Sequence, residues 1–128
     1  MIAELFMKTK NKLYHYSAKV TRVVDGDTVD ALIDLGFDMH SKQRIRLYGI
    51  DTPECRTRDL VEKKAGFAAK ARLVEMLRDN KNCCVVRTRL DKKGKYGRVL
   101  GILYVNECDL NAQLVWEGYA KKYHGGSR

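Results

Sequence analysis

Two short stretches of this sequence bring together residue types that could bind a cation or move a proton. Residues 25–30 read DGDTVD and residues 44–54 read RIRLYGIDTPE. Between the first aspartate and the last glutamate of these stretches the chain holds seven acidic residues against three basic ones, whereas the whole chain has a formal net charge of +9. A local excess of carboxylates in a basic protein needs a physical reason.

Three reasons are open. Aspartates in D-G-D and D-T-P sequences favour tight turns through their own side-chain hydrogen bonds. Carboxylates in pairs also suit hard cations such as Ca²⁺ and Mg²⁺, which take oxygen ligands. A single carboxylate can act as a general acid or base, and Glu54 directly follows the turn expected at Pro53, where its side chain can project into a cleft. Each aspartate taken singly fits the turn interpretation best.

Two arginines add a way to bind an anion. Guanidinium groups grip phosphate oxygens bidentately. Arg46 and Asp51 are five residues apart and would face opposite sides of a regular strand, so we expect Gly49 to supply a bend that brings both into one cleft. Arg98 ends the most basic segment, residues 87–98, where Lys92 and Lys93 are expected to be solvated or in loose contact with a nucleic-acid backbone. A cation, a water-directing carboxylate and arginines together suit phosphodiester hydrolysis.

The composition limits the class of protein. At 128 residues with 45% hydrophobic residues, the chain predicts one folded domain, which we place at residues 14–128 after an N-terminal segment at 1–13. A pI near 9.5 points to polyanionic partners. No apolar run approaches the roughly 18 residues of a membrane span, and the first residues lack the features of a signal peptide. We therefore expect no membrane partner and an intracellular, cytoplasmic protein; the resemblance described below makes a phage-encoded form the alternative.

The hydrophobic pattern predicts a mainly β, α+β fold. Aromatic and β-branched runs bounded by turn residues predict strands at 14–24, 28–35, 43–50, 83–90 and 98–105. A three- and four-residue periodicity predicts a long helix at 61–79, with a buried face formed by Ala65, Ala69, Leu73, Met76 and Leu77. Asp109 is expected to cap a short helix that ends at Gly118. Three strands, a helix, two strands and a short helix follow one another as in a five-stranded OB-type Greek-key barrel.

The four cysteines do not predict a disulfide or a zinc site. Cys83 and Cys84 are adjacent in a predicted strand and so point to opposite faces, no C-x-x-C spacing occurs, and the three histidines are isolated. We expect four buried free thiols.

The ordered motifs resemble the staphylococcal nuclease (thermonuclease) family. The matching stretches are D-G-D-T at 25–28, R-L-Y-G-I-D-T-P-E at 46–54 and K-Y-G-R at 95–98. V-E-K at 61–63 and L-V-x-x-G-x-A-K at 114–121 are also similar. An ordered set of this kind is far more specific than one short match. The resemblance covers about residues 14–121 and implies an OB barrel, in agreement with the predicted strand order.

The resemblance also implies a role for each matching residue. Asp27 and Asp51 would bind Ca²⁺ through their carboxylates and Thr52 through its backbone carbonyl. Glu54 would direct the attacking water, and Arg46 and Arg98 would hold the phosphate and stabilise the transition state. Lys95 and Tyr96 would contact a terminal phosphate of a bound nucleotide. Asp25 would support the metal pair or only shape the turn, and a base-stacking patch falls near Tyr119, Tyr123 and His124 but out of register.

The implied activity is a Ca²⁺-dependent, sugar-nonspecific nuclease. Its partners would be DNA and RNA, with single strands favoured, and its products would carry 3′-phosphate ends. The alternative is a catalytically inactive OB-fold module that only binds nucleic acid or protein. Such a module is expected to have lost at least one acid or arginine of the motif, and none is missing here.

Overall fold

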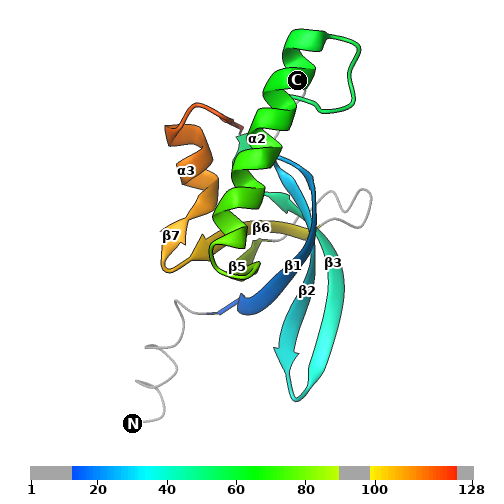
Figure 1. Ribbon diagram of the computed structural model, residues 1–128. Helices are drawn as coiled ribbons and strands as arrows, with labels where there is room; N and C mark the ends of the chain where they lie inside the picture. Colours follow the sequence, from blue (N-terminus) through cyan, green and yellow to red (C-terminus); the bar gives the residue numbers. More distant parts are fainter. Residues whose placement is uncertain (1–12, 90–98, 124–128) are drawn as a thin grey trace.

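In the part of the chain that the structure describes, a closed five-stranded β-barrel is packed against two helices (Figure 1). The computed structural model describes residues 13–89 and 99–123. The barrel strands are β1 (His15–Asp25), β2 (Thr28–Gly36), β3 (Met39–Leu47), β5 (Cys83–Arg89) and β6 (Val99–Val105). Neighbouring strands are antiparallel in the order β3-β2-β1-β5-β6, and a parallel pairing of β3 with β6 closes the barrel. The predicted mainly β, OB-type fold is confirmed.

Three short strands and the two helices complete the described structure. The two-residue strand β4 (Ile50–Asp51) pairs with β8 (Lys121–Lys122), and β7 (Cys108–Asp109) extends the sheet beside β6. Helix α2 (Leu60–Arg78) follows β4, and helix α3 (Leu110–Trp116) follows β7. The predicted cap of the short helix is confirmed, because the Asp109 side chain accepts a hydrogen bond from the backbone N–H of Ala112 at 2.9 Å.

The third strand differs from its predicted range of 43–50. Strand β3 begins at Met39, because the tight turn at Gly36, Phe37 and Asp38 lets pairing with β2 start almost at once. It ends at Leu47, and Gly49 then adopts a φ of +80° before the chain resumes as β4. The bend inferred at this glycine is therefore present, and it divides what the sequence pattern predicted as one strand.

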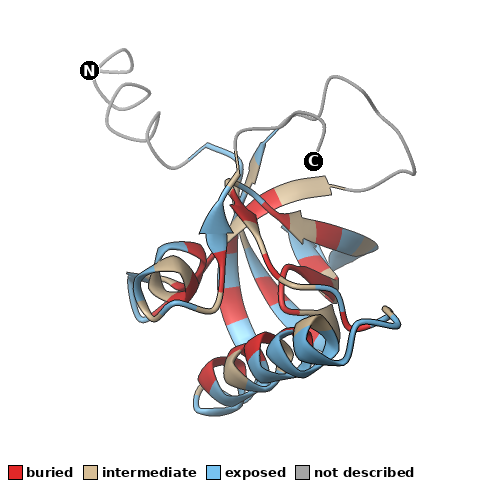
Figure 2. Cartoon of the chain, turned by 90° about the horizontal axis from the view of Figure 1, so that it is seen from above, coloured by how far each residue is buried: buried red, intermediate tan, exposed pale blue. Residues whose placement is uncertain are grey.

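The core lies between the inner face of the barrel and helix α2. Alternating residues of the strands point inward, and Figure 2 shows the buried residues of α2 on the side that faces the sheet. The fully buried large side chains are Val29, Ile45, Leu47, Leu73, Leu77, Val86, Leu103 and Leu114. The predicted inner face of α2 is correct except at one position, since Ala65 is exposed and Gly66 is buried in its place.

Helix α3 is tied to the barrel by one buried polar side chain. Asn111 is 3% exposed, and its amide donates to the carbonyl oxygens of Tyr48 at 2.9 Å and Gly101 at 3.1 Å. Its Oδ1 accepts from the backbone N–H of Leu103 at 3.3 Å. A buried amide with these partners satisfies backbone groups that strand pairing leaves over, so it holds α3, β6 and the end of β3 in one arrangement.

All four cysteines are free, as predicted, but only two of them are buried. Cys55 and Cys84 are buried, whereas Cys83 and Cys108 are exposed. The prediction of four buried thiols is wrong because Cys83 lies on the outward face of β5, opposite to its neighbour in the strand. Within the described part of the chain, no helix has the length and apolar character that crossing a membrane requires.

Candidate nuclease-type active site

The first part of the site is the turn between β1 and β2, which carries Asp27. This side chain is 7% exposed, and both of its carboxylate oxygens accept hydrogen bonds. Oδ1 accepts from the hydroxyl of Thr28 at 3.0 Å, and Oδ2 accepts from the backbone N–H of Thr52 at 3.1 Å. Asp27 is therefore oriented by Thr28 at the start of β2 and by Thr52 after β4. Its carboxylate connects the β1–β2 turn to the segment that follows β4.

The second part of the site is the bend between β3 and β4. In a regular strand the side chains of Arg46 and Asp51 would face opposite sides. The bend at Gly49 turns Asp51 toward Arg46, so that Arg46 Nη2 lies 3.4 Å from Asp51 Oδ1. The same Nη2 atom lies 3.5 Å from Asp27 Oδ2. The expected meeting of Arg46 and Asp51 is present in the structure, and Asp27 lies beside the same nitrogen atom.

Backbone carbonyls hold the Arg46 guanidinium in place. Its Nη1 donates to the carbonyl of Leu47 at 3.0 Å and to that of Asp27 at 3.5 Å, and its side chain is only 12% exposed. The ring of Tyr123 lies on another side, with its centroid 5.8 Å from the guanidinium carbon. A guanidinium anchored in this way is preorganised and presents a fixed pattern of donors.

A small polar pocket opens at this point. It has a volume of about 120 Å³ and is lined by Asp25, Asp27, Thr28, Arg46, Thr52, Pro53 and Glu54. Apart from the proline, every lining residue carries an acidic, basic or hydroxyl group. A pocket of this composition suits a small charged group such as a phosphate with its counterion, and it does not suit an apolar ligand.

Helix α2 positions Glu54 at the rim of this pocket. Gly66 packs so closely on the chain that a Cβ atom there would lie 2.6 Å from the carbonyl oxygen of Glu54 and 2.8 Å from that of Pro53. The backbone N–H of Glu54 also donates to Glu62 Oε1 of α2 at 3.5 Å. The long helix therefore supports the backbone that carries the expected water-directing carboxylate.

The donor set fits a hard cation. The carboxylates of Asp27 and Asp51 both lie within 3.5 Å of Arg46 Nη2, so they already share one positively charged neighbour. The hydroxyl of Thr52 is buried and lacks a hydrogen-bond partner among the described residues. No group of three or more His, Cys, Asp or Glu side chains within residues 13–89 and 99–123 is arranged to hold a metal. A cation here would therefore need ligands beyond the two carboxylates, such as a backbone carbonyl, water and phosphate oxygens.

Three of the predicted site residues lie outside the described residues: Lys95, Tyr96 and Arg98. Among the residues that are described, Arg46, Asp27 and Asp51 meet directly, and Thr52 and Glu54 line the same pocket as Arg46 and Asp27. Asp51 contacts Arg46 without lining that pocket.

Two neighbours of the site were not predicted as functional from the sequence. Tyr123 reaches Arg46 because its backbone N–H donates to the carbonyl of Gly49 at 2.8 Å, a pairing between segments far apart in the chain that no local pattern signals. Cys55 is buried behind Asp25, and burial, together with a hydrogen bond to that carboxylate, raises the pKa of its thiol. The raised pKa keeps Cys55 a neutral thiol at physiological pH.

Comparison with known proteins shows which family this chain belongs to. The family model described as staphylococcal nuclease homologue matches residues 44–127. A thermonuclease of Staphylococcus intermedius is 34% identical over 91% of this chain and 65% of its own length. A micrococcal nuclease of Shigella flexneri is 30% identical over 86% of this chain and 61% of its own, and an uncharacterised protein of Methanocaldococcus jannaschii is 32% identical over 85% and 60%.

This chain spans less than two thirds of the length of each of these relatives. The family model nevertheless matches more than half of the chain, and the match includes Arg46, Asp51 and Glu54. On these grounds the protein belongs to the staphylococcal nuclease family.

Proposed function

We propose that this protein is a Ca²⁺-dependent nuclease, with residues 14–128 as a single catalytic domain, that hydrolyses phosphodiester bonds of DNA and RNA and leaves 3′-phosphate ends. The observation that carries the proposal is that Arg46 Nη2 lies within 3.5 Å of a carboxylate oxygen of Asp27 and of Asp51. Arg46 and Asp27 line a polar pocket together with Glu54. Relatives named thermonuclease and micrococcal nuclease support the reaction class.

The cation would be held by the carboxylates of Asp27 and Asp51 and by the backbone carbonyl of Thr52. When bound, calcium would place positive charge against a nonbridging phosphate oxygen and lower the cost of charge developing there. The hydrogen bonds from Thr28 and from the Thr52 N–H keep the Asp27 carboxylate in one orientation, so little reorganisation is needed when the cation binds.

Glu54 would orient a water molecule and accept its proton. As the water oxygen forms its bond to phosphorus, the bond to the 5′ oxygen breaks, and the leaving oxygen takes up a proton from solvent. The released strand then carries the phosphate on its 3′ end. This role is supported by the place of Glu54 in the lining of the pocket that Arg46 and Asp27 also line.

Arginines would hold the phosphate through the reaction. Arg46 is fixed by two backbone carbonyls and so presents its donors without further ordering. Arg98 would also bind the phosphate and face the leaving oxygen, and Lys95 and Tyr96 would contact a terminal phosphate. These three assignments rest on the K-Y-G-R motif at 95–98 and on its family resemblance.

A digestion assay tests the proposal. Single-stranded DNA, duplex DNA and RNA are each incubated with the protein in Ca²⁺, and then in the presence of a chelator. We expect cleavage of all three, faster for single strands, with fragments that end in 3′-phosphate and no cleavage under chelation. Retention of the strands without cleavage at any Ca²⁺ concentration would favour the inactive binding module instead.

A further inference from the structure

We propose that the outer face of β1, β2 and β3 carries a track for the single-stranded substrate, formed by Lys19, Arg22, Lys42 and Arg44 and leading away from the pocket. This inference rests on the proposed function, because it names where the substrate strand lies beyond the bond that is cut. None of these four residues belongs to the motifs that define the site.

The track begins at Arg46 on strand β3. Side chains alternate between the two faces of a strand, and Ile45 and Leu47 are buried in the core, so Arg46, Arg44 and Lys42 all point outward. Lys42 and Arg44 are exposed. From Arg46 to Lys42 the strand advances about 13 Å at the usual rise per residue.

Pairing with the neighbouring strands widens this line into a band. Arg44 lies opposite Asp30 of β2, and Asp30 lies opposite Arg22 of β1. In the next row Lys42 lies opposite Leu32, which lies opposite Lys19. These two rows hold four cationic side chains and one carboxylate, so the band carries a net positive charge.

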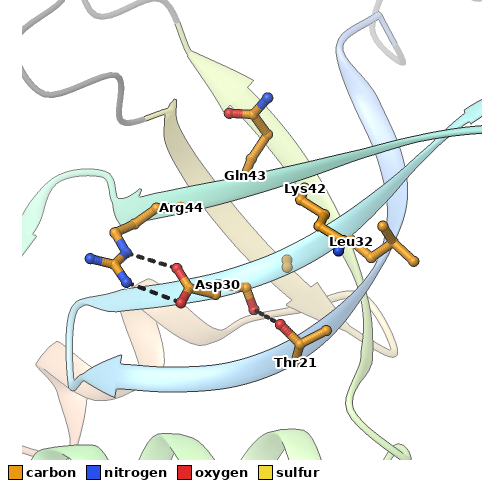
Figure 3. A pocket seen from close by; sticks show the side chains of 7 residues that line it. Thr21, Asp30, Leu32, Lys42, Gln43 and Arg44 are labelled. Atoms are coloured by element: carbon orange, nitrogen blue, oxygen red, sulfur yellow. Dashed lines mark hydrogen bonds and ion pairs between the residues drawn. The ribbon is translucent and has the colours of Figure 1, made fainter.

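Asp30, the one carboxylate in these rows, orients Arg44 and leaves the band with a net positive charge. Asp30 accepts from Arg44 through both oxygens, from Nε at 2.8 Å and from Nη2 at 3.1 Å (Figure 3). This hydrogen bond holds the pKa of Asp30 below its usual range, so the pair stays ionised at neutral pH. Arg22 and Lys42 have no such carboxylate partner among the described ion pairs, which leaves their charge available to a ligand.

A hollow lies at the Lys42 and Arg44 side of this band. It has a volume of about 450 Å³ and is lined by Thr21, Asp30, Ala31, Leu32, Lys42, Gln43 and Arg44 (Figure 3). The half-buried Leu32 gives the hollow an apolar surface between the cationic groups. Charged walls around an apolar floor suit a strand that offers phosphates and bases in turn.

A single nucleic-acid strand is the occupant that fits these features. The band is cationic, it is continuous with the arginine of the proposed phosphate site, and it lies on the strand 2 and strand 3 face with which OB barrels bind oligonucleotides. Single strands are bound by positively charged grooves that follow the backbone, over about 4–16 nucleotides for each OB fold. A second protein would need a larger apolar contact than Leu32 provides.

Binding without cleavage tests the track. The full chain and its Arg22→Gln/Lys42→Gln double variant are titrated, in chelator and at several salt concentrations, into a fluorescein-labelled oligothymidylate of about twelve nucleotides. We expect the slope of log K against log salt to fall in magnitude by about 0.7 for each lost phosphate contact. The matched control is Lys64→Gln/Arg78→Gln, which removes two exposed charges from α2 and should leave the slope close to that of the wild type.

A second readout separates the track from the site. With Ca²⁺, the double variant should cleave a dinucleotide as well as the wild type does and lose rate only on long strands. Three results would each overturn the track. The Arg22→Gln/Lys42→Gln variant could show the same salt slope as the α2 control, or the wild type could bind the oligonucleotide without any salt dependence. The double variant could also lose as much cleavage rate on the dinucleotide as on long strands. If the wild type cleaves no substrate, the proposed function fails, and the anisotropy slopes still decide whether the track binds nucleic acid.

Discussion

Arg46 is the residue that contacts both acidic segments of the site. It lies within 3.5 Å of carboxylate oxygens from the β1–β2 turn and from strand β4, and it is anchored by the Leu47 carbonyl at 3.0 Å. Because the two acidic side chains would otherwise repel each other, a fixed cationic group beside both helps keep them close. The same group can hold a phosphate when one is bound, so positioning and binding rest on one side chain.

Glu54 gives the sharpest test of the proposed chemistry. Glu54→Gln keeps the size of the side chain but removes the base, so turnover should fall by on the order of 10²–10⁴ while oligonucleotide binding persists. Single-turnover rates and anisotropy measure the two effects separately. Glu107→Gln, an exposed change in the turn after β6, is the control and should behave as the wild type. Wild-type turnover by Glu54→Gln would remove this residue from the mechanism.

Arg46→Lys separates charge from geometry. Lysine keeps the positive charge, but one ammonium group cannot reproduce a fork that contacts a backbone carbonyl and two carboxylates together. We expect kcat/KM to fall by about 10²–10³, as when one fixed donor to a transition state is lost. The exposed Arg87→Lys on β5 controls for the exchange itself, and equal rates in the two variants would show that charge alone suffices.

At the scale of elements, two joints, which we define as the backbone bend at Gly49 and the backbone contact at Gly66, position the side chains of Asp51 and Glu54. The bend at Gly49 turns Asp51 toward Arg46, and the close approach of α2 at Gly66 supports Glu54. The sequence pattern led to the first joint because a strand-like run contained a glycine. It obscured the second, because a glycine inside a helix lowers helix propensity and its packing reason lies in another part of the chain.

Gly66→Ala tests the second joint. A Cβ atom there would lie 2.6 Å from the Glu54 carbonyl oxygen, so the backbone of Glu54 must move. We expect turnover to fall by up to about 10²-fold, and no gain of the roughly 1 kcal/mol that alanine normally adds in a helix. Ala68→Gly, on the exposed side of the same helix, should lose about 1 kcal/mol of unfolding free energy and keep its activity. A more stable and fully active Gly66→Ala would contradict the account of this joint.

Helix α2 is joined to the C-terminal end of α3 by an ion pair. Arg72 donates from Nε and Nη2 to Glu117 at 2.6 and 2.9 Å, and Gln113 also donates to this carboxylate at 2.6 Å. The hydrogen bonds from Arg72 and Gln113 lower the pKa of Glu117 to about 2. A carboxyl whose pKa is lower in the folded state stabilises the fold above its unfolded pKa, and this contribution is lost as the pH falls through the folded value.

The pH dependence of unfolding tests this pair. At pH 7 the wild type should exceed Glu117→Gln by about 1 kcal/mol in unfolding free energy. The difference should shrink as the pH falls from the ordinary value of 4.5 toward 2, because the wild-type carboxyl then becomes neutral like its replacement. Denaturant titrations across this range measure the difference, with Glu107→Gln as the control. A difference that stays constant down to pH 2 would show that the ion pair does not stabilise the fold.

At the scale of the whole molecule, the sequence predicted the barrel and its helices well. Alternating strand patterns and turn residues located all five barrel strands, and Asp109 located the start of α3. These features are local, since each depends on neighbours along the chain. The resemblance then supplied the residues of the site, of which Asp27, Asp51 and Arg46 are in contact.

What the sequence did not predict depends on contacts between distant segments. The parallel pairing of β3 with β6, the buried amide of Asn111 and the contact of Tyr123 with Arg46 join residues separated by many others. The β1–β3 band has the same origin, because Lys19 and Lys42 share a row only through the register of three strands. Such a register depends on the geometry of the two turns that join the strands and on the bulges within them, neither of which the strand patterns assign.

The most direct test of the central claim is a crystal structure of the protein soaked with calcium and a nucleotide bisphosphate. The account predicts one Ca²⁺ ligated by the carboxylates of Asp27 and Asp51 and by the carbonyl of Thr52, with a phosphate held by Arg46 and Arg98 and a water molecule on Glu54. An ion bound elsewhere, or a phosphate that leaves Arg46 untouched, would contradict it.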